Sequence, residues 1–113
     1  MSNHYSIESL REISDDDSSF MMVVARTFLE EIPPDLASLK DAIINNNKEL
    51  AYQFAHKMKP NIEMFGIDVI KQITAIESWT KTSKSTETVL PQIELVVTTL
   101  HRVFDELKED FNL

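Results

Sequence analysis

The residues of this chain best suited to chemistry are a histidine and a lysine one helical turn apart, His56 and Lys59. Both lie in the run AHKMKPNIEMFG, residues 55–66. At 100° per residue, the apolar side chains of this segment fall in an arc of about 140° centred near Met58, and His56 lies about 160° from that centre. We therefore expect the imidazole to face solvent, where a reactant can reach it.

Several neighbouring side chains share this surface. Tyr52, Pro60 and Glu63 project within about 40° of His56, and Lys59 projects within about 60°. The competing interpretation is an ordinary surface histidine with a solvated lysine beside it. If the surface is instead used for binding, its candidate partner contacts are Tyr52, Gln53, Lys57, Pro60, Glu63 and Met64.

Other chemistries lack the residues they need. The chain has no cysteine, and its histidines show no His-x-x-x-His or His-Glu-x-x-His spacing, so we predict no metal site. Gly66 is the only glycine, which excludes the P-loop, the dinucleotide fingerprint and a nucleophile elbow. His4 and His101 have no matching motif and are interpreted as surface residues.

Composition limits the class of protein. A chain of 113 residues with 42% hydrophobic and 27% charged residues is typical of one globular domain, residues 1–113. The net charge of −8 argues against nucleic-acid binding and favours a protein partner. There is no apolar run of about 20 residues and no signal peptide, so we expect a cytoplasmic protein without a membrane segment. Met1 directly before a folded pattern favours a free-standing protein.

Helices are predicted before the segment of His56. Ser6 can cap a short first helix that carries Ile7, Leu10 and Ile13 and that we expect to act as a lid. The run 15–19 offers N-caps for a second helix. The apolar residues of that second helix recur at helical spacing and are expected to pack in the core: Phe20, Val24, Phe28 and Ile32.

Two adjacent prolines predict a helix break. Pro33 lacks the backbone N–H that a helix interior needs, so we expect it to end the second helix. Pro33 and Pro34 then fit the first turn of a third helix, which stops at the turn 45–47. The apolar stripe of this third helix is Leu36, Leu39 and Ile43.

The helix of His56 is predicted from about residue 48 to residue 65. Gly66 closes it in the left-handed position that commonly follows a helix. Asp68 can cap the next helix, and the polar run 81–88 is the longest linker. The buried face of that next helix is expected to contain Val69, Ile70, Ile73, Ile76 and Trp79.

A last helix is predicted from about residue 89 to residue 111, with Pro91 tolerated in its first turn. No segment alternates convincingly with period two. One glycine and four prolines in the whole chain leave few sharp turns. We therefore predict an all-α fold, an antiparallel four-helix bundle with short N-terminal helical elements. The apolar side of the last helix is Ile93, Val97, Leu100, Phe104, Leu107 and Phe111.

The run around His56 resembles the signature of histidine-containing phosphotransfer (HPt) domains, His-x-(Leu/Met)-Lys-Gly followed at a fixed distance by a second glycine. The matches are His56, Met58, Lys59 and Gly66, and Pro60 stands where the first glycine usually lies. The opening helices also resemble those of the family. The part after residue 68 matches only as a helical pattern.

This resemblance implies a phosphoryl carrier in a multistep two-component phosphorelay. His56 would accept a phosphoryl group from a receiver-domain aspartate and pass it to another receiver, and Lys59 would support the phosphoryl oxygens. The implied partners are receiver domains of a hybrid histidine kinase or a response regulator, which carry the Mg²⁺. The chain itself would need no cofactor and would not be a self-sufficient enzyme, because it has no kinase machinery.

Two alternatives remain open. A helical adaptor that binds a receiver or another protein without chemistry would share this composition, with His56 incidental. A histidine-kinase dimerisation domain is disfavoured because no nucleotide-binding domain follows, and we expect a monomer.

Overall fold

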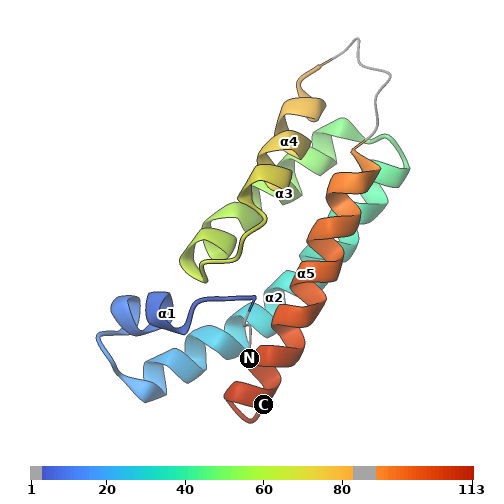
Figure 1. Cartoon of the computed structure of the whole chain (residues 1–113). Helices are drawn as coiled ribbons and strands as arrows, with labels where there is room; N and C mark the ends of the chain where they lie inside the picture. The colour runs from blue at the N-terminus through green and yellow to red at the C-terminus, as the bar shows by residue number, and fades with distance from the viewer. Residues whose placement is uncertain (1–3, 83–88) are drawn as a thin grey trace.

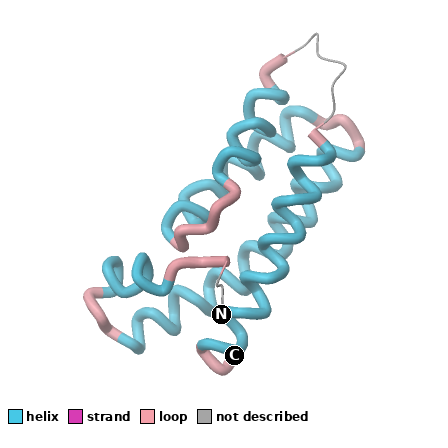
Figure 2. The backbone as a smooth tube through the Cα atoms, in the orientation of Figure 1, coloured by secondary structure: helices cyan, strands magenta, loops and turns pink. Residues whose placement is uncertain are grey.

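The computed structural model describes residues 4–82 and 89–113, and these residues are all-helical with no strand (Figure 2). This confirms the predicted all-α class. Residues 83–88 of the predicted linker lie outside the described residues. The helices are α1 (Ile7–Ser14), α2 (Ser18–Ile44), α3 (Lys48–Met64), α4 (Ile70–Thr80) and α5 (Leu90–Asp110).

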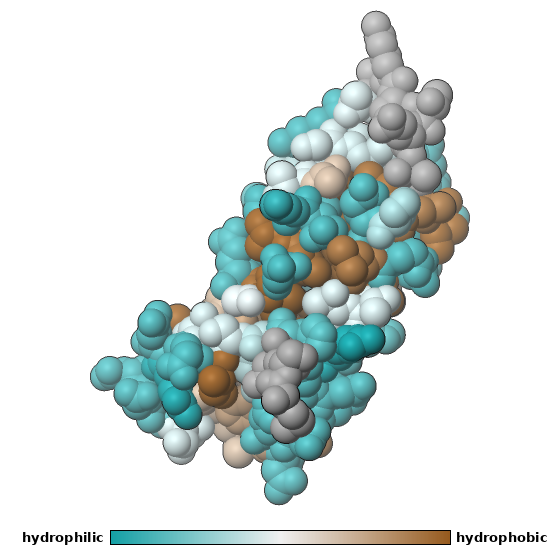
Figure 3. Space-filling view, in the orientation of Figure 1, coloured by the Kyte–Doolittle hydropathy of each residue, from teal (hydrophilic) through white to brown (hydrophobic). Residues whose placement is uncertain are grey.

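The helices pack side by side around one apolar core (Figure 1). Helix α2 contacts α3 and α5, α3 contacts α4, α4 contacts α5, and α1 lies on the N-terminal part of α2. Burying one large apolar side chain contributes about 1.5 to 3 kcal/mol. On the face shown in Figure 3, apolar surface is interrupted by hydrophilic residues. The fully buried side chains include Leu10, Ile32, Leu39, Met58, Ile62, Ile73, Leu100 and Leu107.

Helix α2 runs unbroken through Pro33 and Pro34, so the predicted helix break is wrong. A proline in a helix interior costs about 3 kcal/mol relative to alanine. That cost is offset here because side chains on both sides of the prolines bury the same face against the core, each contributing about 1.5 to 3 kcal/mol. These buried side chains are Phe28, Ile32, Leu36 and Leu39.

The N-terminal buried face of α2 also differs from the predicted one. Counting back one heptad from Phe28 reaches Met21, which is buried, whereas Phe20 is 47% exposed and Val24 only partly buried. The predicted core position of Phe20 is therefore wrong. Ile13 is also exposed, because α1 turns Leu10 and Ser14 inward instead.

Most predicted helix ends are confirmed. The Ser6 side chain accepts a hydrogen bond from the Ser9 N–H, and Asp17 caps α2 through the N–H groups of Ser19 and Phe20. Asp68 does not cap α4, which begins after Val69 with no side-chain cap. The reason is that Val69 is buried, so the entry into α4 follows apolar packing rather than a polar cap. Pro91 lies in the first turn of α5, as predicted.

Gly66 ends α3 as predicted, with a φ of +63°. Its N–H donates to the Glu63 carbonyl, and the Ile67 N–H donates to the Ile62 carbonyl, which together form a Schellman motif. A Cβ atom on Gly66 would lie 2.7 Å from the Ser6 Cβ. Glycine is therefore required here both by backbone conformation and by the close approach of the N-terminal segment.

The N-terminal segment before α1 is hydrogen-bonded to the C-terminal ends of α3 and α5. The Ser6 N–H donates to the Phe65 carbonyl at 2.7 Å, and the Tyr5 hydroxyl donates to the Asp110 carboxylate at 2.5 Å. Burial, followed by this hydrogen bond, raises the pKa of the Tyr5 phenol above its ordinary value. These contacts place α1 beside the C-terminal end of α3, the helix that carries His56.

Candidate functional site

His56 lies on the outer face of α3. The inner face of the helix buries Ala51, Ala55, Met58 and Ile62, while the His56 side chain is 68% exposed. The predicted outward orientation of the imidazole is confirmed. An exposed ring on a rigid helix is accessible to a second protein without any rearrangement of the core.

Glu77 of α4 bridges the two residues that the motif singled out. His56 Nδ1 lies 3.4 Å from Glu77 Oε2, and Lys59 Nζ donates to Glu77 Oε1 at 3.1 Å. With its proton on Nδ1, the ring donates to the carboxylate, and Nε2 keeps its lone pair for an electrophile. The arrangement therefore orients the imidazole and brings a cation within one turn of it.

The Glu77 carboxylate is held largely away from water, because its side chain is only 12% exposed. An isolated charge in such a place is costly, and the ammonium of Lys59 compensates it. Lys59 has three donor hydrogens, so its bond to Glu77 leaves two for another acceptor. The pair supplies a fixed cation beside His56 without a net local charge.

Tyr52, one turn before His56, stacks on the imidazole. The two ring centroids are 5.6 Å apart with an interplanar angle of 11°. The ammonium of Lys81, at the end of α4, lies 5.2 Å from the centroid of the Tyr52 ring. Tyr52 therefore contacts His56 directly, in addition to its predicted role as a partner contact.

Lys57 points to the other side of α3, toward α2. Its ammonium donates to Asp35 Oδ1 at 3.0 Å, and the Asp35 side chain is 10% exposed. Successive helical residues diverge by 100°, which separates Lys57 from the cluster of His56, Lys59 and Glu77. The structure thus engages Lys57 in an ion pair between α2 and α3.

The remaining predicted contacts are distributed along α3. Gln53, Pro60 and Glu63 are exposed, whereas Met64 is partly buried against the core. Pro60 lies inside the helix, which continues to Met64. Gly66 closes the helix rather than contacting His56. The structure brings Tyr52, His56 and Lys59 together and leaves the others around them.

Glu77 belongs to no motif that would mark it as a site residue in the sequence. Its position carried a signal, since it lies four residues after the core residue Ile73 and directly after the core residue Ile76. A carboxylate on the border of a buried helix face needs a cationic partner. The position of Glu77 in the sequence does not indicate which lysine is its cationic partner.

Comparisons of the chain with models of protein families, with curated proteins and with solved structures find no match. Among the residues described, no three ligand-type side chains gather where they could hold a metal ion. No helix in the described ranges has the length and apolarity needed to cross a membrane. The geometry of the site is therefore the basis for inferring its function.

Proposed function

We propose that this chain is a histidine phosphotransfer protein of a multistep two-component phosphorelay. The observation that carries the proposal is the exposed His56 on α3, oriented through Nδ1 by Glu77 and flanked by Lys59. The helices α2 to α5 would then form the antiparallel four-helix bundle of this class. The protein would act in the cytoplasm as a monomeric single domain.

The proposed reaction is a direct transfer between two proteins. Nε2 of His56 attacks the phosphorus of an aspartyl phosphate on a receiver domain, so a P–N bond forms as the P–O bond to the aspartate breaks and the carboxylate leaves. The imidazole proton on Nδ1 stays in contact with Glu77. The reverse sequence passes the group to a second receiver, and Mg²⁺ belongs to the receivers.

Lys59 would stabilise the transferring group. Its ammonium is held by Glu77 and has two further donors for phosphoryl oxygens. Hydrogen bonds to charged groups contribute roughly 1.5 to 3 kcal/mol, which is enough to affect the transfer rate. Gln53, Lys57, Pro60, Glu63 and Met64 would contribute to the surface on which the receiver docks.

Incubation with a phosphorylated receiver domain and Mg²⁺ tests this proposal. The expected result is label on this chain that is labile in acid and stable in base, as for a phosphohistidine. A chain that binds the receiver without acquiring label would instead be the non-catalytic adaptor. A chain that neither binds nor acquires label from a panel of receivers would contradict both functions.

A further inference from the structure

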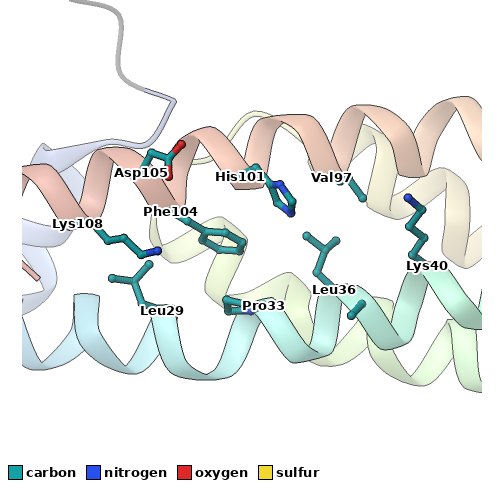
Figure 4. A pocket seen from close by; sticks show the side chains of 10 residues that line it. Leu29, Pro33, Leu36, Lys40, Val97, His101, Phe104, Asp105 and Lys108 are labelled. Carbon is teal, nitrogen blue, oxygen red and sulfur yellow. The ribbon is translucent and has the colours of Figure 1, made fainter.

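A groove lies between α2 and α5, formed by residues of those two helices alone (Figure 4). His56, Lys59 and Glu77 belong to α3 and α4, so the groove is a separate feature of the molecule. Its volume is about 480 Å³. The lining residues include Leu29, Pro33, Leu36 and Lys40 of α2, and Val97, His101, Phe104 and Lys108 of α5.

The lining residues follow the same spacing on both helices. On each helix they recur at i, i+4, i+7, i+8 and i+11, the spacing with which a helix presents a stripe to a neighbouring helix. From Leu29 to Lys40 the stripe is about 16 Å long at 1.5 Å per residue. An elongated groove between two helical stripes fits a third helix of about 11 residues.

Each stripe is apolar at its start and ends in a lysine. Because α2 and α5 are antiparallel, Lys40 and Lys108 lie at opposite ends of the groove, and His101 lies between them (Figure 4). Neither lysine has an ion pair within the described part of the chain. Asp105 also lines the groove, but its carboxylate points away from α2 in Figure 4.

We infer that this groove docks an amphipathic helix of a partner protein, one with an apolar face and acidic residues at both ends of that face. The apolar floor supplies contact area, and the two unpaired lysines are complementary to the acidic ends. A second copy of this chain is a poorer occupant. In either two-fold arrangement of two grooves, lysines would lie opposite lysines.

Two fluorescein-labelled helical peptides test the inference by fluorescence anisotropy. Both have leucines along one face; one has glutamates at both ends of that face, and the other has lysines there. The parent protein should bind the glutamate peptide and not the lysine peptide. Amide chemical shifts should change along the α2 and α5 stripes and not around His56.

The double variant Lys40→Glu/Lys108→Glu should bind the glutamate peptide at least about tenfold more weakly and should now prefer the lysine peptide. Lys71→Glu, an exposed position on α4, is the matched control and should bind like the parent. The melting temperature of each variant verifies its fold. Phosphotransfer is not needed for any of these readouts, so the inference can fail independently of the proposed function.

Three results would overturn the inference. The first is absence of saturable binding of the glutamate peptide, or equal binding by parent and double variant. The second is a set of chemical-shift changes centred on α3 and α4. The third is a concentration-dependent dimer, detected by sedimentation, that the double variant loses, because the occupant would then be a second copy.

Discussion

Two surfaces of this acidic chain carry lysines: the face formed by α3 and α4, and the groove between α2 and α5. They differ in whether a carboxylate of the protein pairs with the lysine. On the α3–α4 face, Lys59 donates to the largely buried carboxylate of Glu77. Lys40 and Lys108 have no such carboxylate among the described residues. A lysine paired with a buried carboxylate has a defined position, whereas the ammonium of an unpaired lysine can pair with an acidic group of another protein.

The two faces also differ in how their histidines are held. His56 contacts a carboxylate through Nδ1 and stacks on Tyr52, while His101 lies 5.8 Å from the Phe104 ring, centroid to centroid. Only the first arrangement combines orientation, a nearby cation and exposure. If both proposals hold, group transfer belongs to the α3–α4 face and partner binding to the groove, and this division of roles can be tested with matched pairs of substitutions.

The largest expected effect is loss of labelling in His56→Gln. The variant should acquire no phosphoryl label from a phosphorylated receiver, and its free energy of unfolding should change by less than about 0.5 kcal/mol because the side chain is exposed. His101→Gln, in the groove, should retain labelling. Label that survives in His56→Gln and disappears in His101→Gln would reverse the assignment of the two faces.

Lys59→Ala should slow transfer from the receiver by about tenfold to a hundredfold, the rate equivalent of one charge-assisted contact. Lys108→Ala should leave the rate within about twofold, since that lysine lies in the groove. Rapid-quench measurement of single-turnover transfer checks both. A Lys59→Ala rate equal to that of Lys108→Ala would mean that Lys59 serves only to neutralise Glu77.

Glu77→Gln should lower the free energy of unfolding by about 1 to 2 kcal/mol, because Lys59 loses its ionic partner but can still reach water. Asp105→Asn, an exposed acid at the groove, should change it by less than about 0.5 kcal/mol. Urea unfolding of the two variants gives the comparison. Equal stabilities would indicate that the ion pair of Glu77 contributes nothing to the fold.

The smallest expected effects come from the prolines of the two faces. Pro60→Ala in α3 should raise the free energy of unfolding by about 0.5 to 2 kcal/mol by restoring a helix hydrogen bond, and Pro33→Ala in α2 should act in the same direction. Transfer should change by less than about tenfold in Pro60→Ala and by less than about twofold in Pro33→Ala. Urea midpoints and transfer rates measured on the same samples check this. A clear loss of stability in Pro60→Ala would show that the proline supports α3.

Local patterns in the sequence were sufficient to predict the exposure of His56 and several helix ends. The apolar arc of α3 predicted the exposure of His56, and the single glycine predicted the left-handed end of that helix at Gly66. The caps at Ser6 and Asp17 were likewise readable, because a cap is satisfied by backbone groups two or three residues away. Each of these features depends on neighbours along the chain.

Other features depended on contacts between helices. Pro33 predicted a helix end by its own chemistry, but the core on both sides of it kept α2 continuous. The partners of Lys57 and Lys59 lie 22 and 18 residues away, at Asp35 and Glu77. Local spacing determined which way each side chain leaves its helix, and only the packing of the helices decided which charges meet.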